Sequence, residues 1–386
     1  MGKALPDSQR LDPPPVATAW PCSRPCQGAW SKADATVGGG ARLLSRKLDQ
    51  PVTNVNANKF PRGVMNPNAS AAPSADVNVS ATGGAHMILA IGNGKGGTGK
   101  TTLAMVLAGE AAYRRHRVLV IDLDVQANAT EHLIGVGDPL RSPQGDGGRA
   151  LYRMIMDGED VSPVKVNDYL ELLPAGPRTQ SLADELQRHA ATSNDALGRS
   201  LAGLRRALHD QTAAFDLVII DTPPSEQSHA MLDCVLVAAD AVVIPTKISK
   251  ADIDGAVKLL QRLAALDRLG TPYAFPLGAA LMAVPTGAKR LVDHAEVNLE
   301  VITRHIPLFS ARMHYRPAPI SESERRHSTL RDLQRTVPTT SARFAALKRG
   351  VGIDEHLGSE SIAKTVAEGA ALYDEVLRRY AAQVAA

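Results

Sequence analysis

The chain has 386 residues, of which 44% are hydrophobic and 4% aromatic, and its formal net charge at pH 7 is +3. The length fits two to three domains, or one large α/β domain with additions. No apolar run approaches the roughly 18–20 residues that span a bilayer, and the first thirty residues contain no apolar signal segment. With only three cysteines, the composition argues against secreted, disulfide-rich and membrane-spanning classes and favours a reducing cytoplasm.

Residues 1–86 differ in composition from the rest of the chain. They hold ten of the 25 prolines and both tryptophans, with a glycine triplet at 38–40 and an Asn/Ser/Ala-rich stretch over 54–84. No helical or strand period is long enough to support a core there, so we predict a disordered extension before a folded domain over 87–386. Because Met87 opens the first predicted strand, we expect that it is the native start or that the extension is a dispensable tail.

From residue 87 onward, short apolar runs alternate with segments of helical spacing. Predicted strands cover 87–91, 118–121, 169–173, 217–220, 241–244 and 277–284, and predicted helices include 102–112, 196–208 and 370–381. The Gly/Pro-rich stretch 135–148 is a predicted mobile loop. Continuous apolar strands are typical of parallel sheets that are buried on both faces. Their alternation with helices predicts an α/β fold with a mostly parallel central sheet and helices on both faces.

The first strand is followed by a glycine-rich loop that fits the phosphate-binding pattern G-x-x-x-x-G-K-[ST]. The loop consists of Gly94, Lys95, Gly96, Gly97, Thr98, Gly99, Lys100, Thr101 and Thr102. Glycines let backbone N–H groups cradle phosphate oxygens, and the N-terminus of the next helix favours anions. Lys100 is then expected at the β/γ phosphates and the Thr101 hydroxyl on Mg²⁺. Such a loop needs one lysine, so Lys95 requires another explanation.

Three carboxylates follow predicted strands. Asp122 and Asp124 come after the strand at 118–121, and Asp221 comes after the strand at 217–220. Open α/β sheets place their ligand sites at this edge, where an aspartate can bind Mg²⁺ or its water shell. An aspartate at a strand end can also cap a helix or begin a turn. Three of them downstream of a phosphate-binding loop favour the metal site.

Positive charge gathers late in the folded region. Residues 303–349 hold ten lysines and arginines against three acidic residues. Such an excess attracts a polyanion, or it forms a solvated basic face without a partner. The ten basic residues are Arg304, Arg312, Arg316, Arg325, Arg326, Arg331, Arg335, Arg343, Lys348 and Arg349.

Three segments in order resemble the motifs of the ParA/MinD ATPases. Residues 95–102 look like the deviant Walker A motif of that family, residues 122–130 resemble its D-x-D-P-Q-G-N motif, and residues 219–225 resemble its Walker B segment. The resemblance covers roughly 87–386, weakens after about 285, and is closest to the ParA proteins of plasmid and chromosome partitioning. Val125 and Ala127 replace the usual proline and glycine of the second motif, which leaves both carboxylates in place.

The resemblance implies a P-loop NTPase that hydrolyses ATP with Mg²⁺. Lys100 would neutralise the β/γ phosphates, and Thr101 would bind Mg²⁺ with Asp221 supporting the metal through water. Asp122 would support the metal region, and Asp124 would orient or activate the attacking water. Lys95 would reach the nucleotide of a second subunit, so that two ATP molecules lie between two chains.

The resemblance also implies partners. ParA proteins bind DNA non-specifically as ATP dimers through their C-terminal half, and a DNA-bound, ParB-like centromere-binding protein stimulates hydrolysis. The basic stretch 303–349 supplies candidate DNA contacts, and the location would be the cytoplasm, on the nucleoid. Residues 1–86 show no helix-turn-helix, so operator-specific binding is not expected.

Three alternatives have testable sequence requirements. A MinD-like membrane switch needs a basic amphipathic C-terminal helix with bulky apolar residues, whereas 370–381 is Ala-rich, so membrane binding is not expected. A relative of the nitrogenase iron protein needs two cysteines per subunit for its cluster, and only Cys234 lies in the folded region. A small-molecule kinase or synthetase with the same loop stays open.

Overall fold

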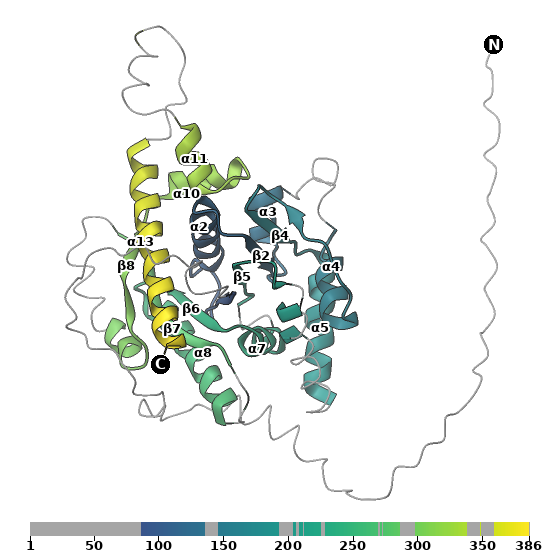
Figure 1. Cartoon of the computed structure of the whole chain (residues 1–386). Coiled ribbons are helices and arrows are strands. Elements are labelled where there is room, and N and C mark those ends of the chain that lie inside the picture. Colours follow the sequence, from purple (N-terminus) through teal and green to yellow (C-terminus); the bar gives the residue numbers. More distant parts are fainter. Residues whose placement is uncertain are drawn as a thin grey trace, which may run out of the picture. The chain divides into compact units, whose positions relative to one another are not determined.

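Within the residues that the structure describes, an eight-stranded sheet forms the centre of the fold (Figure 1). The strand order is β3-β4-β2-β5-β1-β6-β7-β8, and neighbouring strands are parallel except for β3 and β4. The strands are β1 (Met87–Ile91), β2 (Val118–Asp122), β3 (Val164–Lys165), β4 (Leu170–Leu173), β5 (Leu217–Asp221), β6 (Ala241–Thr246), β7 (Phe275–Val284) and β8 (Leu308–His314). The predicted mostly parallel α/β fold is confirmed.

The structure is a computed structural model, and it describes residues 86–135, 146–192, 204–205, 208–210, 212–224, 228–268, 271, 273–285, 298–337, 348 and 359–385. All of these belong to one contact unit, Gly40–Ala386. The predicted disordered extension lies outside them apart from His86, as do most of the predicted loop 135–148 and most of the predicted helix 196–208. The domain boundary at 86/87 stays a prediction.

Helices cover both faces of the sheet. They are α2 (Lys100–Tyr113), α3 (Asn128–Ile134), α4 (Arg149–Tyr152), α5 (Pro177–Thr192), α7 (His229–Ala238), α8 (Lys250–Arg268), α10 (Pro317–Arg325), α11 (Leu330–Thr336) and α13 (Ser359–Val384), with a π-helical turn, η2 (Arg153–Asp157), after α4. No helix among the described residues is long and apolar enough to cross a membrane.

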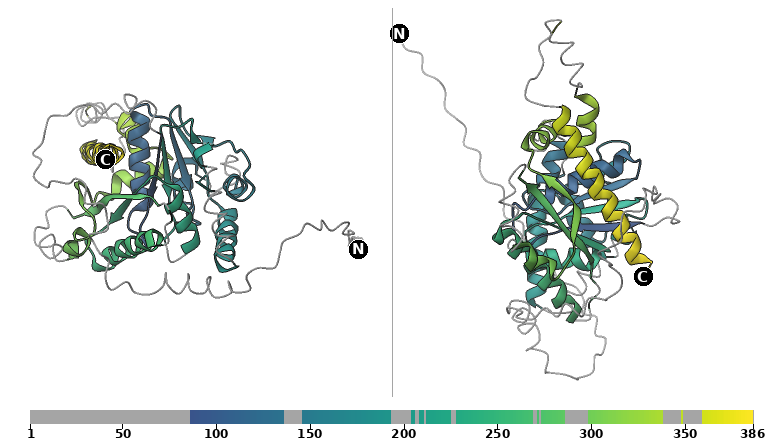
Figure 2. Two further views of the ribbon diagram at one scale, coloured as in Figure 1. Left: turned by 60° about the horizontal axis from the view of Figure 1, so that its bottom comes forward. Right: turned by 90° about the vertical axis from the view of Figure 1, so that its left-hand side faces the viewer.

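Two hydrophobic clusters, one on each face, enclose the sheet. Alternate residues of a strand point to opposite faces, and β1 shows this clearly because all five of its residues are buried. Ile88 and Ala90 pack in the cluster that includes α5, α7 and α8, whereas Leu89 and Ile91 pack with α2, α11 and α13. Figure 2 shows this layering from two further directions. The continuous apolar strands are therefore explained by burial on both sides.

The last strand in the order, β8, is an edge strand that the apolar patterns did not indicate. Its outward positions are polar, including Ser310 and Arg312, so it lacks the continuous apolar run of the central strands. Its exposed backbone N–H groups are satisfied by α13. Glu375 accepts hydrogen bonds from the backbone of Ser310 (2.9 Å) and Ala311 (3.1 Å), and Glu368 accepts one from His314 (3.0 Å). Carboxylates thus cover the edge that would otherwise pair with another strand.

The long C-terminal helix α13 closes one face of the domain. It contacts β8, α2 and α11, and it buries Leu372, Tyr373 and Val376 almost completely. Arg379 donates hydrogen bonds to the carbonyl groups of Leu277 (2.9 Å) and Leu308 (2.6 Å), which ties the helix to β7 and β8. The helix predicted at 370–381 is therefore a packing helix, and it is longer than its apolar pattern indicated.

Candidate nucleotide-binding site

The glycine-rich loop joins the C-terminal end of β1 to the N-terminus of α2. Gly97 and Gly99 have φ angles of 73° and 95°, in the left-handed region that favours glycine. Gly99 is the N-cap of α2, and no side chain caps that helix end. The first N–H groups of α2 therefore remain available for an anion, where the helix dipole also favours one. This geometry matches the predicted phosphate-binding loop.

The start of the loop is held by α8 and β6. The backbone N–H of Gly94 donates to the carbonyl of Gly255 (3.0 Å), and the Asn93 side chain donates to the carbonyl of Pro245 (2.8 Å). A Cβ at Gly255 would lie 2.4 Å from the Asn93 side-chain oxygen, so only glycine permits this approach. The same Asn93 oxygen accepts the backbone N–H of Lys95 (2.9 Å). Asn93 belongs to no motif, and the sequence analysis did not single it out.

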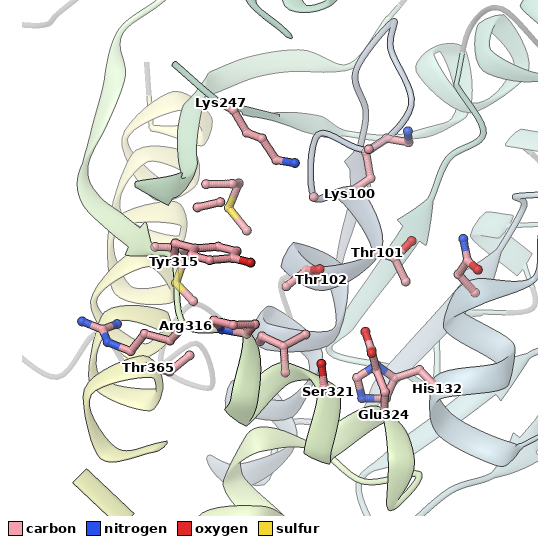
Figure 3. Close-up of a pocket in the computed structure, with 18 of the residues that line it drawn as sticks. Lys100, Thr101, Thr102, His132, Lys247, Tyr315, Arg316, Ser321, Glu324 and Thr365 are labelled. Carbon is pink, nitrogen blue, oxygen red and sulfur yellow. The ribbon is translucent and has the colours of Figure 1, made fainter. Parts of the chain in front are cut away.

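Lys100 lies buried at the start of α2, where its ammonium donates to the carbonyl of Lys95 (3.3 Å). Burial lowers the pKa of Lys100 from its ordinary value, and the negative charges of Asp221 and Asp124 oppose that shift. The loop thus holds a single desolvated cation facing carboxylates. Such a group suits the β/γ phosphates of a nucleotide. Figure 3 shows Lys100, Thr101 and Thr102 on one wall of the cavity.

Thr101 and Asp221 meet, as the metal prediction requires. The Thr101 hydroxyl donates to Asp221 Oδ2 (2.7 Å), and Asp221 Oδ1 is buried without a hydrogen-bond partner among the described residues. Burial and the neighbouring charge of Asp122 raise the pKa of Asp221 well above its ordinary range. A cation or its bound water would satisfy the orphaned oxygen and stabilise the charged carboxylate.

The donor set fits Mg²⁺ better than a metal that needs an all-protein cage. Among the described residues, no three histidine, cysteine, aspartate or glutamate side chains gather in a metal-binding arrangement. Mg²⁺ is commonly bound by one or two protein oxygens plus water and substrate phosphates. The Thr101 hydroxyl and Asp221 could supply those protein oxygens.

Asp122 lies beside Asp221 in the sheet register, but its oxygens are already used. Oδ2 accepts the backbone N–H (2.8 Å) and hydroxyl (2.7 Å) of Thr130, and Oδ1 accepts the backbone N–H of Asp124 (3.1 Å). Burial raises the pKa of Asp122 to about 6, although the hydrogen bonds from Thr130 oppose that shift. Asp122 therefore fixes α3 and the strand end. Its predicted support of the metal region is indirect in this geometry.

Asp124 lines the cavity together with Gln126. Its Oδ1 accepts the backbone N–H of Gln126 (3.0 Å), and its side chain is almost buried. Ala127, the N-cap of α3, has a φ of 53°. That left-handed conformation costs a non-glycine residue about 1–2 kcal/mol, so the alanine at this motif position stores strain directly beside Asp124.

Lys95 points toward its own chain rather than away from it. Its ammonium lies 2.7 Å from Asp252 Oδ1 near the start of α8, with 38% of its side chain exposed. Burial works to raise the pKa of Asp252, but hydrogen bonds from Lys95 and Ser249 hold it below its ordinary value. A contact between Lys95 and a second subunit would require this ion pair to open.

A cavity of about 970 Å³ extends from the loop to the segment between β8 and α10. Figure 3 shows side chains from both ends of it, including Lys100, Tyr315, Arg316 and Thr365. Tyr315 is an exposed aromatic side chain, and Lys247 follows β6 at the loop end. Some of the predicted site residues line this cavity, namely Gly96, Gly97, Gly99, Lys100, Thr101, Thr102 and Asp124. The others do not, namely Gly94, Lys95, Thr98, Asp122 and Asp221. Lys247 and Tyr315 belong to no motif and had no signal in the sequence, whereas Arg316 was singled out only as part of the basic stretch 303–349.

Comparisons with known proteins identify the family of the chain. Residues 86–270 match the AAA_31 family, an AAA domain. The chain is 33% identical over 211 residues to the chromosome-partitioning ATPase Soj of Thermus thermophilus, covering 55% of this chain and 74% of that protein. It is 32% identical over 182 residues to the sporulation initiation inhibitor protein Soj of Bacillus subtilis, covering 47% of this chain and 66% of that protein.

Solved structures show the same fold. An ATP complex of McdA from Cyanothece has a TM-score of 0.54 at 20% identity, covering 70% of this chain and 99% of that one. A plasmid partition protein from Borrelia burgdorferi bound to AMPPNP has a TM-score of 0.51 at 17% identity, covering 77% of this chain and 99% of that one. These structures show the fold, and the match at 33% identity over 74% of the Thermus thermophilus protein shows that the chain belongs to the ParA/Soj family of partitioning ATPases.

Proposed function

We propose that the chain is an ATP-driven dimeric switch of plasmid or chromosome segregation. It binds ATP and Mg²⁺ and forms a dimer with a second copy. The dimer binds DNA non-specifically in the cytoplasm, on the nucleoid. A DNA-bound, ParB-like partner then stimulates ATP hydrolysis. The observation that carries the proposal is the uncapped start of α2 facing the Thr101–Asp221 pair with its orphaned oxygen. That combination fits a nucleoside triphosphate with a divalent cation.

Each predicted residue has a role in this proposal. Lys100 neutralises the β/γ phosphates, and Thr101 with Asp221 holds Mg²⁺, which when bound spreads the charge of the phosphates. Asp124 orients the attacking water from the cavity wall. Asp122 keeps Asp124 and α3 in place through its hydrogen bonds. Phosphoryl transfer depends mostly on positioning and charge stabilisation, which this set supplies.

The dimer depends on Lys95. Within a single chain the Lys95 ammonium pairs with Asp252. To reach the nucleotide of a second subunit, Lys95 must leave the Asp252 carboxylate and bind phosphate oxygens instead. The exchange leaves Asp252, whose side chain is 8% exposed, with the Ser249 hydroxyl as its remaining side-chain partner, so the partner's phosphates must offset the loss of this ion pair. Lys95 would then place a second positive charge on the partner's phosphates, as an arginine finger does.

The basic stretch offers fewer free charges than its composition indicated. Arg304 pairs with Glu300, Arg316 with Glu368, Arg325 and Arg326 with Glu322, and Arg331 with Glu110. Arg312 and Arg335 are exposed and make no ion pair with another described residue. Lys348 is also exposed, and Arg343 and Arg349 lie outside the described residues. We propose Arg312 and Arg335 as the first candidates for DNA contact.

The packing of α13 argues against the MinD-like alternative. A membrane-binding helix must present an apolar face, but Leu372, Tyr373 and Val376 are buried against the domain. The exposed positions include Lys364, Asp374 and Arg378. Co-sedimentation with anionic liposomes tests this alternative, and we expect the protein to stay in the supernatant with or without ATP.

DNA binding with and without nucleotide tests the proposal. Fluorescence anisotropy of a labelled duplex of arbitrary sequence is measured with ATP and Mg²⁺, with ADP and Mg²⁺, and without nucleotide. We expect tight, salt-sensitive binding of DNA only in the sample with ATP and Mg²⁺. Lys95→Ala should lose the ATP effect, and Asp124→Ala should stay bound because hydrolysis is blocked. Equal DNA affinity in all three nucleotide states would refute the proposal.

A further inference from the structure

Lys247 is a third lysine near the phosphate-binding loop. It follows β6 directly, and β6 pairs in parallel with β1, so it lies at the same edge of the sheet as the loop. It lines the cavity together with Gly99, Lys100 and Met282. Figure 3 shows its side chain extending from the end of β6 into the cavity, on the side where Lys100 lies. Its position is therefore part of the nucleotide site.

The surroundings of Lys247 leave its ammonium available. It makes no ion pair or side-chain hydrogen bond with another residue in the described part of the chain. The positive charge of Lys247 is one of the effects that lower the pKa of Asp252. Both Asp252 oxygens are taken, since Oδ1 accepts from Lys95 (2.7 Å) and Oδ2 accepts from Ser249 (2.5 Å). Lys247 thus stands next to an anion whose bonds are already satisfied.

The charged side chains around the phosphate site favour a second lysine in addition to Lys100. Lys95 is neutralised by Asp252, which leaves Lys100 as the loop lysine that faces the site. Asp124 and Asp221 act on Lys100 with their negative charges. Even with the proposed Mg²⁺ counted, a triphosphate together with Asp124 and Asp221 would carry more negative charge than Mg²⁺ and Lys100 carry positive charge. The ammonium of Lys247, a partly buried residue of the cavity lining, offsets part of that repulsion.

We propose that Lys247 binds the phosphate chain of the nucleotide held by its own subunit, as a second lysine in addition to Lys100. This inference rests on the proposed nucleotide site. An ammonium has only hydrogen-bond donors, so it fits the acceptor oxygens of a phosphate and gives little recognition of a sugar or base. The ligand class is therefore a nucleoside di- or triphosphate, bound from two sides.

Isothermal titration of wild type, Lys247→Ala and Lys247→Arg with adenosine, ADP and ATP tests this role. Loss of a hydrogen bond to a charged group should weaken ADP and ATP binding by about ten- to a hundred-fold in Lys247→Ala. Adenosine binding should not change, and Lys247→Arg should retain most of the phosphate affinity. The matched control is Lys250→Ala, because Lys250 is 81% exposed and pairs with Asp254 on the outside of α8. Unchanged ADP and ATP affinity in Lys247→Ala would overturn the inference.

A purely structural role for Lys247 predicts a different pattern. If Lys247 only balanced Asp252, its removal would have no effect in an Asp252→Asn background, and that result would overturn the inference too. We expect the loss of phosphate affinity to persist there. Because titration needs neither DNA nor a dimer, a protein that binds ADP through Lys247 but binds DNA independently of ATP would refute the proposed function alone.

Discussion

The phosphate end of the sheet and the C-terminal region are built in different ways. At the phosphate end, the loop, Asp124 and Asp221 come from short contiguous motifs, and backbone groups make many of the contacts. In the C-terminal region, β8, α11 and α13 are held by ion pairs between residues far apart, such as Arg331 with Glu110 and Arg316 with Glu368. The site residues therefore come from short sequence motifs, whereas the second half of the fold is stabilised by ion pairs between residues far apart in the sequence.

The difference predicts that the two regions fail in different ways. Removing a residue at the phosphate end should abolish ligand binding and leave folding intact. Removing a carboxylate beneath β8 should lower the free energy of unfolding of the domain and leave the folded protein able to bind nucleotide.

Glu375→Ala should be the most destabilising of these changes. It leaves the backbone N–H groups of Ser310 and Ala311 and the buried guanidinium of Arg379 without their carboxylate. Breaking a buried charge pair costs about 3–5 kcal/mol, which urea denaturation measures as a lower free energy of unfolding. The control is Asp374→Ala, one residue away with a side chain 50% exposed, where about 0–1 kcal/mol is expected. Equal losses at both positions would contradict the role of α13 at the edge strand.

Lys100→Ala should abolish tight nucleotide binding without unfolding the protein. We expect ATP and ADP affinity to fall by about a hundred-fold or more, because a charge-assisted contact to phosphate is lost. The free energy of unfolding should not fall, since Lys100 is desolvated and donates only to the Lys95 carbonyl among the described residues. Titration and urea denaturation of the same sample give both quantities. A variant that binds ATP like the wild type would break the contrast between the two regions.

Thr329→Ala should cost about 1 kcal/mol of stability through the loss of a helix cap. Thr329 caps α11 by accepting from the backbone of Asp332, whose side chain returns a bond to the Thr329 backbone. Thermal unfolding measures the loss, and Thr329→Ser keeps the hydroxyl and serves as the control. If serine loses as much stability as alanine, packing of the Thr329 methyl group against Gly109 is the larger contribution.

Asp252→Asn should release Lys95 and shift dimer formation slightly. The ion pair is partly exposed, so its loss should strengthen the ATP-dependent dimer by about two- to five-fold. Analytical ultracentrifugation with a non-hydrolysable ATP analogue measures the dimer dissociation constant. Asp254→Asn, on the outside of α8, should leave that constant unchanged. A weaker dimer in Asp252→Asn would show that Asp252 supports the loop rather than retaining Lys95.

The sequence could predict what depends on local pattern. The strands β1, β2, β5 and β6 are continuous apolar runs because both faces are buried, and β1, β2 and β5 lead into the three motifs. The fold class and the meeting of Thr101 with Asp221 followed from that arrangement. The edge strand β8 could not be predicted, because polar residues alternate along it and its pairing groups are supplied by α13.

The remaining site features depend on tertiary contacts. Lys95 and Asp252 are 157 positions apart, and no local pattern links them. Asp122 looks like a metal ligand in the sequence, but the fold turns its oxygens toward Thr130 and Asp124. Lys247 is a lone lysine after a strand, and only the pairing of β6 with β1 brings it to the loop. Residues of this kind need the structure to be found.

Sedimentation velocity in three nucleotide states shows whether ATP links two copies of the chain. Wild type should sediment as a monomer without nucleotide and with ADP and Mg²⁺, and as a dimer with ATP and Mg²⁺. Lys100→Ala and Lys95→Ala should remain monomeric in all three. An identical sedimentation coefficient for wild type in every nucleotide state would contradict the account.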